Sequence, residues 1–161
     1  MLIENKSLHY DLSIGQSMIT KRPAIVTCFG LGSCIGVFIY DKLGRIGGGA
    51  HIMLPGDKIY SNLPEKHHYA NSGLKDLVNI MRQYGSTLVL HAKLVGGANV
   101  LSTSGYQIGE RNALAVHQIL DDLKVKIISQ DLGGSMSRTA RFNFPQNIVE
   151  VKTSEGKKYI I

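Results

Sequence analysis

Two apolar, β-branched runs on either side of a glycine-rich turn constrain the fold of this chain most strongly. Residues 25–29 and 34–40 have the composition of β-strands, and Gly30-Leu31-Gly32-Ser33 separates them. A second turn signal, Asp41-Lys42-Leu43-Gly44, leads to a third strand around residues 45–54. Because short turns join these strands, the sequence predicts an antiparallel meander of three strands.

Two later segments have the period of an amphipathic helix. Apolar residues fall three or four positions apart between about residues 65 and 84, and again between about residues 110 and 123. Gly85 follows the first segment, where a glycine commonly ends a helix. Further strands are predicted at residues 88–95, 125–130, 138–144, 147–152 and 157–160. The pattern indicates one domain, residues 1–161, of α+β class, with mostly antiparallel strands and two main helices that cover sheet faces in layers.

Composition limits the classes of function. No apolar run approaches the roughly 20 residues that a membrane span requires, and the N-terminal residues lack the pattern of a signal peptide. We therefore expect a cytoplasmic protein without membrane insertion. The net charge of +6 favours acidic partners, but the 18 Lys and Arg residues are scattered and the chain has no Trp. An acidic protein is the expected partner, and nucleic acid is not.

The two cysteines, Cys28 and Cys34, are too few for a disulfide framework or a zinc finger. Cys34 is the more informative of the two, because it stands where the glycine-rich turn meets a strand. Backbone N–H groups of such a turn, at Gly32 and Ser33, are suited to binding an oxyanion. On composition alone, however, a thiol packed in the core is the preferred interpretation, and a nucleophile is the alternative.

A nucleophilic cysteine requires a base, because the thiolate is the reactive form. Among the six histidines, His51 has the most suitable context, since it lies on the strand that follows the one beginning at Cys34. If the hairpin turns near residues 41–44, Cys34 and His51 are equally far from the turn. Cross-strand neighbours have Cβ atoms about 4.5–5.5 Å apart, close enough for a thiol–imidazole pair. The spacing makes this pair plausible without establishing it.

These residues resemble the active-site signature of the CheD family of chemoreceptor glutamine deamidases. The resemblance begins with Gly30–Val37 and Ala50–Pro55. It continues in order through Tyr69-Ala70, Ala92–Ala98, Ile108–Asn112 and Asp131–Arg138. Several motifs in the right order, from about Val26 to Val151, are far more specific than any one of them.

The resemblance implies a fold, an activity and a site. The fold is a layered α/β sandwich similar to the deamidase domain of cytotoxic necrotizing factor toxins. The activity is hydrolysis of selected glutamine side-chain amides to glutamates on methyl-accepting chemotaxis receptors, in their cytoplasmic region. Cys34 is then the nucleophile and His51 the general base, with no metal and no organic cofactor. A CheC-type phosphatase is a further expected partner, and the alternative function is a binding module that regulates such a phosphatase.

One position departs from the family pattern. The family carries a threonine that orients the histidine, usually six residues before the nucleophile, where this chain has Cys28. Thr27 stands seven residues before Cys34 and would point to the other face of its strand unless a bulge shifts the register. We favour Thr27 as the third catalytic residue and leave Cys28 open as the alternative, with a weak thiol in place of a hydroxyl.

Overall fold

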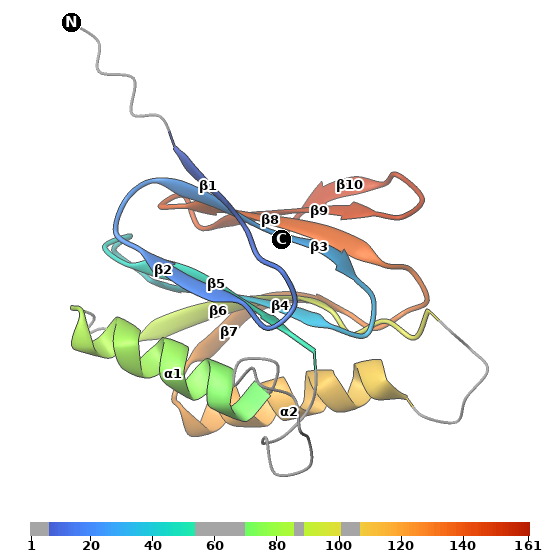
Figure 1. The fold of residues 1–161 in the computed structure, drawn as a ribbon, viewed down its shortest axis with the longest axis horizontal. Coiled ribbons are helices and arrows are strands. Elements are labelled where there is room, and N and C mark those ends of the chain that lie inside the picture. The colour runs from blue at the N-terminus through green and yellow to red at the C-terminus, as the bar shows by residue number, and fades with distance from the viewer. Residues whose placement is uncertain (1–6, 54–69, 86–88, 101–106) are drawn as a thin grey trace, which may run out of the picture.

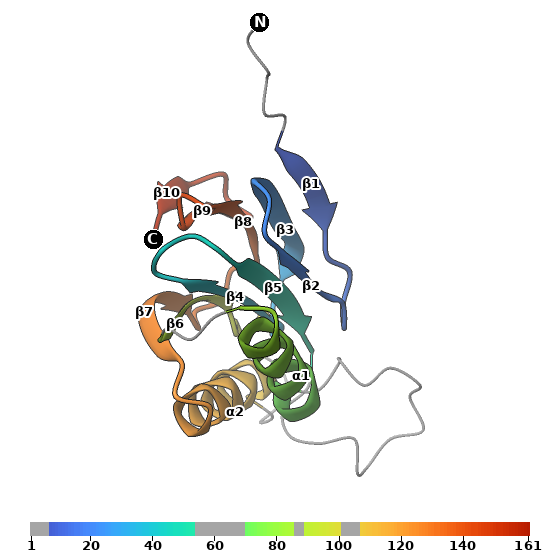
Figure 2. The same ribbon diagram turned by 90° about the vertical axis from the view of Figure 1, so that its left-hand side faces the viewer.

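Two five-stranded sheets and a layer of two helices make up the part of the chain that the computed structural model describes, residues 7–53, 70–85, 89–100 and 107–161 (Figure 1). The helices cover one face of the central sheet, and the outer sheet stacks on its other face (Figure 2). The predicted α+β class with layered helices is therefore confirmed. No helix in the described ranges is long and apolar enough to cross a membrane.

The outer sheet contains strands from both ends of the chain, in the order β1-β3-β8-β9-β10. Its only parallel neighbours within the described residues are β1 and β3. The strands are β1 (Leu8–Asp11), β3 (Ala24–Leu31), β8 (Arg138–Phe144), β9 (Ile148–Thr153) and β10 (Lys158–Ile160).

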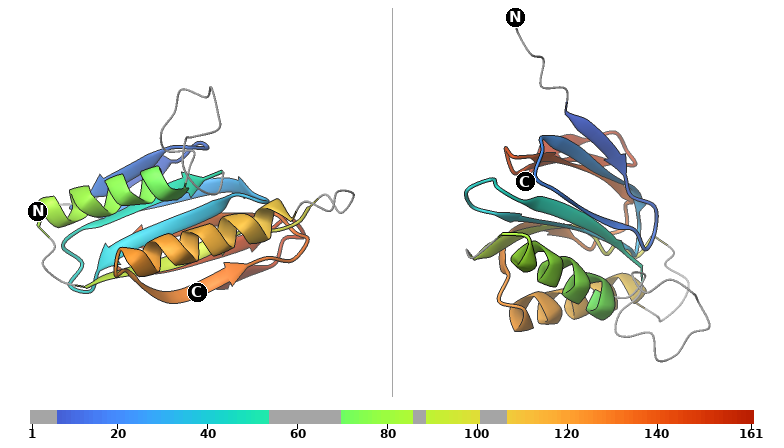
Figure 3. Two further views of the ribbon diagram at one scale, coloured as in Figure 1. Left: turned by 90° about the horizontal axis from the view of Figure 1, so that it is seen from below. Right: turned by 60° about the vertical axis from the view of Figure 1, so that its left-hand side comes forward.

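The central sheet has the order β2-β5-β4-β6-β7. Helix α2 lies between the parallel strands β6 and β7 in the chain, and α1 and α2 pack side by side on the sheet (Figure 3). The strands are β2 (Ser17–Thr20), β5 (Gly47–Ile52), β4 (Ile35–Asp41), β6 (Leu90–Gly96) and β7 (Lys126–Leu132), and the helices are α1 (Ala70–Gln83) and α2 (Ile108–Asp122).

The predicted three-stranded meander is wrong at its first turn. Strand β3 pairs with β1 and β8, so the glycine-rich turn carries the chain from the outer sheet to the central sheet. The second turn does join an antiparallel pair, β4 and β5. Every residue of β4 is buried, because its alternate residues meet the helices on one face and the outer sheet on the other. A short glycine turn fits both a hairpin and a crossing between stacked sheets, so the sequence does not separate them.

The buried face of α1 agrees with the prediction, except at its end. Gly73, Leu74, Leu77, Val78 and Met81 are buried against the central sheet. Tyr84, at the end of the range predicted as helical, is exposed, because the helix ends at Gln83. The predicted start of this helix, residues 65–69, lies outside the described residues.

Two short strands, β1 and β2, have no counterpart among the predicted elements. All four residues of β1 are exposed, and β2 is only partly buried, so neither has the apolar alternation of a strand. They matter for the site, because the segment between them, residues 12–16, hydrogen-bonds to the strand that carries His51.

Candidate active site

Cys34 and His51 face the same layer, the apolar core between the two sheets. On β4 the residues Ile35, Val37 and Ile39 pack toward the helices, whereas Cys34 belongs to the core between the sheets. His51 on β5 is paired with Gly36, two positions after Cys34. Residues directly opposite each other on neighbouring strands point to the same face of a sheet, and so do residues two positions apart on one strand. The structure thus brings the predicted nucleophile and base to one side of the central sheet.

The register differs from the expected one by two positions. Gly36 rather than Cys34 stands directly opposite His51, so Cys34 is its diagonal neighbour. Diagonal neighbours are about 7–8 Å apart at Cα, which an aromatic ring spans. Leu31 and Cys28 from the outer sheet pack over Gly36, where an added Cβ would lie 3.0 Å from Leu31 Cδ1 and 3.5 Å from Cys28 Cβ. Glycine at position 36 therefore lets the two sheets approach each other closely between the side chains of Cys34 and His51.

The imidazole of His51 is held in one tautomer. Its Nδ1 lies 3.0 Å from the backbone carbonyl oxygen of Leu12. Because a carbonyl oxygen can only accept, Nδ1 carries the proton and Nε2 bears a free lone pair. Nε2 is buried and has no hydrogen-bond partner among the described residues. A buried acceptor without a hydrogen-bond partner lowers the stability of the fold. A general base requires such a free lone pair, and Nε2 of His51 supplies it.

The orienting group of His51 is therefore a backbone carbonyl, which differs from the predicted threonine side chain. On β3, Val26 and Cys28 face the core between the sheets, so Thr27 points to the opposite face. The register of the β3–β8 pairing shifts only after Cys28, so the shift does not change the face on which the Thr27 side chain lies. Thr27 contributes through its backbone, since its carbonyl accepts the N–H of Leu12 at 2.8 Å. A backbone carbonyl has no residue-type signal, so the sequence could not identify Leu12.

The electrostatics of the pair are set by burial. Burial raises the pKa of the Cys34 thiol, and a hydrogen bond from its own backbone N–H lowers it in part. Burial lowers the pKa of His51, and the bond to the Leu12 carbonyl raises it in part. Both groups are therefore neutral near pH 7, Cys34 as a thiol and His51 as an uncharged imidazole. Burial, with Cys34 nearby, raises the pKa of Cys28 to about 12, so the second thiol stays protonated.

The turn that carries Cys34 is anchored through its carbonyl groups. The oxygen of Gly32 accepts the N–H of Ala98 at 2.7 Å, and the oxygen of Cys34 accepts the N–H of Gly97 at 2.9 Å. In a trans peptide the N–H points away from the preceding carbonyl, so the N–H of Ser33 points away from Ala98. The N–H of Gly32 itself donates to Gly30 at 2.9 Å. Of the two predicted oxyanion residues, Gly32 has its N–H engaged within the turn.

Asn112 joins the two halves of the site. Its Nδ2 donates to the carbonyl of Ser33 at 2.8 Å and to that of Met53 at 2.9 Å, and the side chain is fully buried. Ser33 precedes Cys34, and Met53 follows His51 by two residues. Asn112 lies inside α2, on the buried face of the helix. An asparagine among the apolar residues of a helix face was the available signal.

Gly96 allows the closest backbone contact at the site. Its φ is +124°, and an added Cβ would lie 2.1 Å from the carbonyl oxygen of Cys34. We expect Gly96→Ala to lower the free energy of unfolding by more than about 2 kcal/mol, because both the conformation and the contact oppose a side chain. Urea denaturation measures the change. Gly32→Ala is the control, since its Cβ meets only Val100 Cγ2 at 3.4 Å, and an equal loss in both variants would contradict this assignment.

The fold and the site together define a class: a layered α+β domain with a buried cysteine–histidine pair at a glycine turn. A family model described as CheD chemotactic sensory transduction matches residues 53–153. The chain is 35% identical to a probable chemoreceptor glutamine deamidase CheD of Caldanaerobacter subterraneus subsp. tengcongensis, over 98% of this chain and 100% of that protein. This chain therefore belongs to the CheD family.

Two further proteins are similar to this chain. The chemoreceptor glutamine deamidase CheD of Thermotoga maritima is 35% identical over 90% of this chain and 92% of its own length. Among solved structures, the hypothetical protein YfiH of Bacillus licheniformis aligns with 81% of this chain and 61% of its own, with 12% identity and a TM-score of 0.49. The likeness to the cytotoxic necrotizing factor domain stays a prediction.

Proposed function

We propose that this chain is a chemoreceptor glutamine deamidase that uses Cys34 as nucleophile and His51 as general base. The observation that carries the proposal is the orientation of His51, whose Nδ1 is bound to Leu12 while its buried Nε2 is free on the face of Cys34. The names of the relatives supply the substrate, a glutamine side chain of a chemoreceptor. The chemistry is amide hydrolysis, and the products are glutamate and ammonia.

Acylation is the first half of the reaction. Nε2 of His51 takes the proton from Cys34 Sγ as the sulfur attacks Cδ of the glutamine, and the C=O electron pair moves to the oxygen. The N–H groups of Ser33 and Cys34 stabilise this oxyanion, because the carbonyls that precede them are bound on the opposite side. One such donor is worth about 2.7–4 kcal/mol. The C–N bond then breaks, and His51 gives its proton to the departing ammonia.

Deacylation uses the same base. Neutral His51 takes a proton from water, whose oxygen attacks the thioester carbon. The C–S bond then breaks, and the sulfur of Cys34 recovers the proton from His51, which leaves glutamate on the receptor. Cys34 is 9% exposed and His51 3% exposed, so we expect the substrate to approach from the side of Cys34.

The proposed function has a direct chemical test. Incubation with a receptor cytoplasmic fragment converts each selected glutamine to glutamate, which raises the fragment mass by about one unit and releases one ammonia. Tandem mass spectrometry locates each site, and a coupled assay counts the ammonia. Unchanged fragment mass with receptors that carry glutamines at their modification sites would refute deamidation.

The pH dependence follows from the direction of the His51 shift. Because burial lowers its pKa below 6.5, His51 stays neutral at pH 6.5 and becomes protonated only at lower pH. Activity is therefore expected to be present above that lowered pKa and to fall as the pH drops through it. Plots of log kcat/KM against pH measure the midpoint. An acid limb centred above pH 6.5 would contradict a base buried in this way.

The remaining expectations are also part of the proposal. The reaction takes place in the cytoplasm, on the cytoplasmic region of the receptors. Binding of a CheC-type phosphatase is an additional role, and co-purification of the two proteins tests it. The fold is further proposed to be a layered sandwich like that of the cytotoxic necrotizing factor deamidase domain. Superposition of the two structures tests this likeness.

A further inference from the structure

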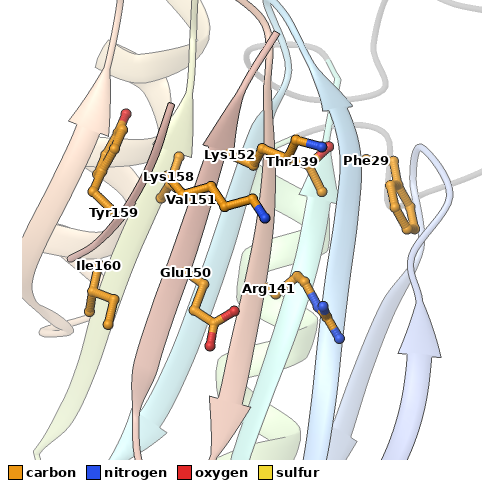
Figure 4. Close-up of a pocket in the computed structure, with 9 residues that line it drawn as sticks. All are labelled: Phe29, Thr139, Arg141, Glu150, Val151, Lys152, Lys158, Tyr159 and Ile160. Atoms are coloured by element: carbon orange, nitrogen blue, oxygen red, sulfur yellow. The ribbon is translucent and has the colours of Figure 1, made fainter. Parts of the chain in front are cut away.

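The outer face of the outer sheet carries a surface that the proposed chemistry does not use. No helix or strand among the described residues covers this face (Figures 1 and 2). A cavity of about 790 Å³ lies on it, lined by side chains of β3, β8, β9 and β10 (Figure 4). The lining includes three cations, Arg141, Lys152 and Lys158, and one carboxylate, Glu150.

The strand register arranges these charges in two rows. Arg141 is directly opposite Glu150, so that cation has a carboxylate as its neighbour. In the next row Lys152 is directly opposite Lys158 on one side and Thr139 on the other, and neither neighbour is acidic. Figure 4 shows both rows across the strands. Like charges directly opposite each other are destabilising, so the pair of lysines is costly in the free protein.

An exposed aromatic residue completes this surface. Phe29 lines the same cavity and is 57% exposed, although it lies on a strand whose inward residues are fully buried. Aromatic side chains beside cations are frequent anchors in protein interfaces. We name Phe29, Lys152 and Lys158 the lysine–phenylalanine surface.

The lysine–phenylalanine surface leads to the cysteine turn. A second cavity of about 240 Å³ shares Thr139 and Lys152 with the first and reaches Gly30. Gly30 begins the turn that ends at Cys34. A segment bound across the lysines therefore lies next to the backbone that positions the nucleophile.

We propose that the lysine–phenylalanine surface binds an acidic segment of the protein substrate and holds it while its glutamine reaches Cys34. Carboxylates of that segment contact Lys152 and Lys158, and an apolar side chain contacts Phe29. Charge complementarity favours this occupant, because the lining carries three cations against one carboxylate and the whole chain has a net charge of +6. The inference rests on the proposed function and adds how the substrate is recognised.

The test removes the two charges and keeps the side-chain length. Lys152→Gln with Lys158→Gln is expected to raise KM for the receptor fragment at least about tenfold and to change kcat much less, since the lost contacts are to the substrate away from the reacting atoms. The matched control is Lys75→Gln with Lys126→Gln, which makes the same charge change at exposed positions on other faces. An equal rise of KM in both double variants, or no rise in the first, overturns the proposal.

Two readouts make the test independent of turnover and of folding. Fluorescence anisotropy of a labelled receptor fragment, titrated with Cys34→Ala protein, measures binding even if no deamidation occurs. A loss of binding to the lysine–phenylalanine surface is thereby distinguished from an absence of deamidase activity. Affinity is expected to fall as salt rises from about 50 to 300 mM and to lose this dependence in the Lys152→Gln, Lys158→Gln protein. The urea midpoint of that variant is expected to stay equal or rise, because the repulsion is removed. Salt-independent binding by the parent protein contradicts the inference.

Discussion

Replacing Cys34 with alanine is expected to abolish ammonia release from receptor fragments and to leave the fold intact. In the proposed mechanism the sulfur of Cys34 forms the bond to the substrate carbon, and Cys34 and His51 face the same layer between the two sheets. A loss of at least about a thousandfold in kcat is expected when the nucleophile of a covalent mechanism is removed. Folding should tolerate the change, because removing one small side chain at the edge of a core costs about 1 kcal/mol. The ammonia assay and circular dichroism measure the two effects.

Cys28 provides the matched control for this experiment. It is fully buried in the same core, and burial raises the pKa of its thiol to about 12, so it acts as a packed apolar group. Cys28→Ala should therefore keep most of the activity while lowering stability by about 1–2 kcal/mol. Full activity in Cys34→Ala, or equal inactivation of both variants, would remove Cys34 from the role of nucleophile.

Replacing Asn112 with leucine is expected to reduce kcat by about one to two orders of magnitude with a smaller effect on KM. Leucine has a similar size but donates no hydrogen bond, so the carbonyls of Ser33 and Met53 lose a shared donor. Each buried carbonyl left without a partner costs about 1–3 kcal/mol. The turn that carries Cys34 and the end of β5 beyond His51 are then free to separate. Steady-state kinetics on the receptor fragment measure the split between kcat and KM.

The control must separate lost positioning from lost stability. Val116→Ala lies on the same buried face of α2, one turn later, and should destabilise the protein to a similar extent without releasing the cysteine turn. Urea midpoints are compared with kcat for both proteins. If activity falls in parallel with stability in the two variants, Asn112 is a structural residue only.

The spacing of Cys34 and His51 predicted the shared face but not the register, and the loop between their strands explains both outcomes. Symmetric pairing of Cys34 with His51 requires a turn centred between residues 42 and 43. In the structure Asp41 accepts the backbone N–H groups of Arg45 and Ile46 at 2.7 and 3.3 Å, so the loop runs to residue 46. The pairing moves by two positions as a result. A shift by two positions keeps each side chain on its face, so Cys34 and His51 still lie on the same side of the sheet.

The parts that were not predicted depend on contacts without a residue-type signal. The orienting group of His51 is the Leu12 carbonyl, which any residue could supply. The separation of β3 and β4 into different sheets follows from burial of β4 on both faces, and a short glycine turn is compatible with either arrangement. By contrast, the helices and most strands were predicted from their apolar periodicity. That periodicity arises wherever one side of an element packs on a sheet, whichever strands make up the sheet.

The pH profile of Cys34 alkylation by iodoacetamide tests the central claim, that His51 takes the proton of Cys34, most directly. Peptide mass spectrometry follows the modification of Cys34 in the parent protein and in His51→Gln. In the parent, alkylation should proceed at neutral pH and decline only below pH 6.5, where His51 becomes protonated. In His51→Gln the rate at pH 7 should fall at least about tenfold and recover only at alkaline pH, because burial raises the pKa of the isolated thiol. Superimposable profiles for the two proteins would show that the imidazole does not act on the sulfur.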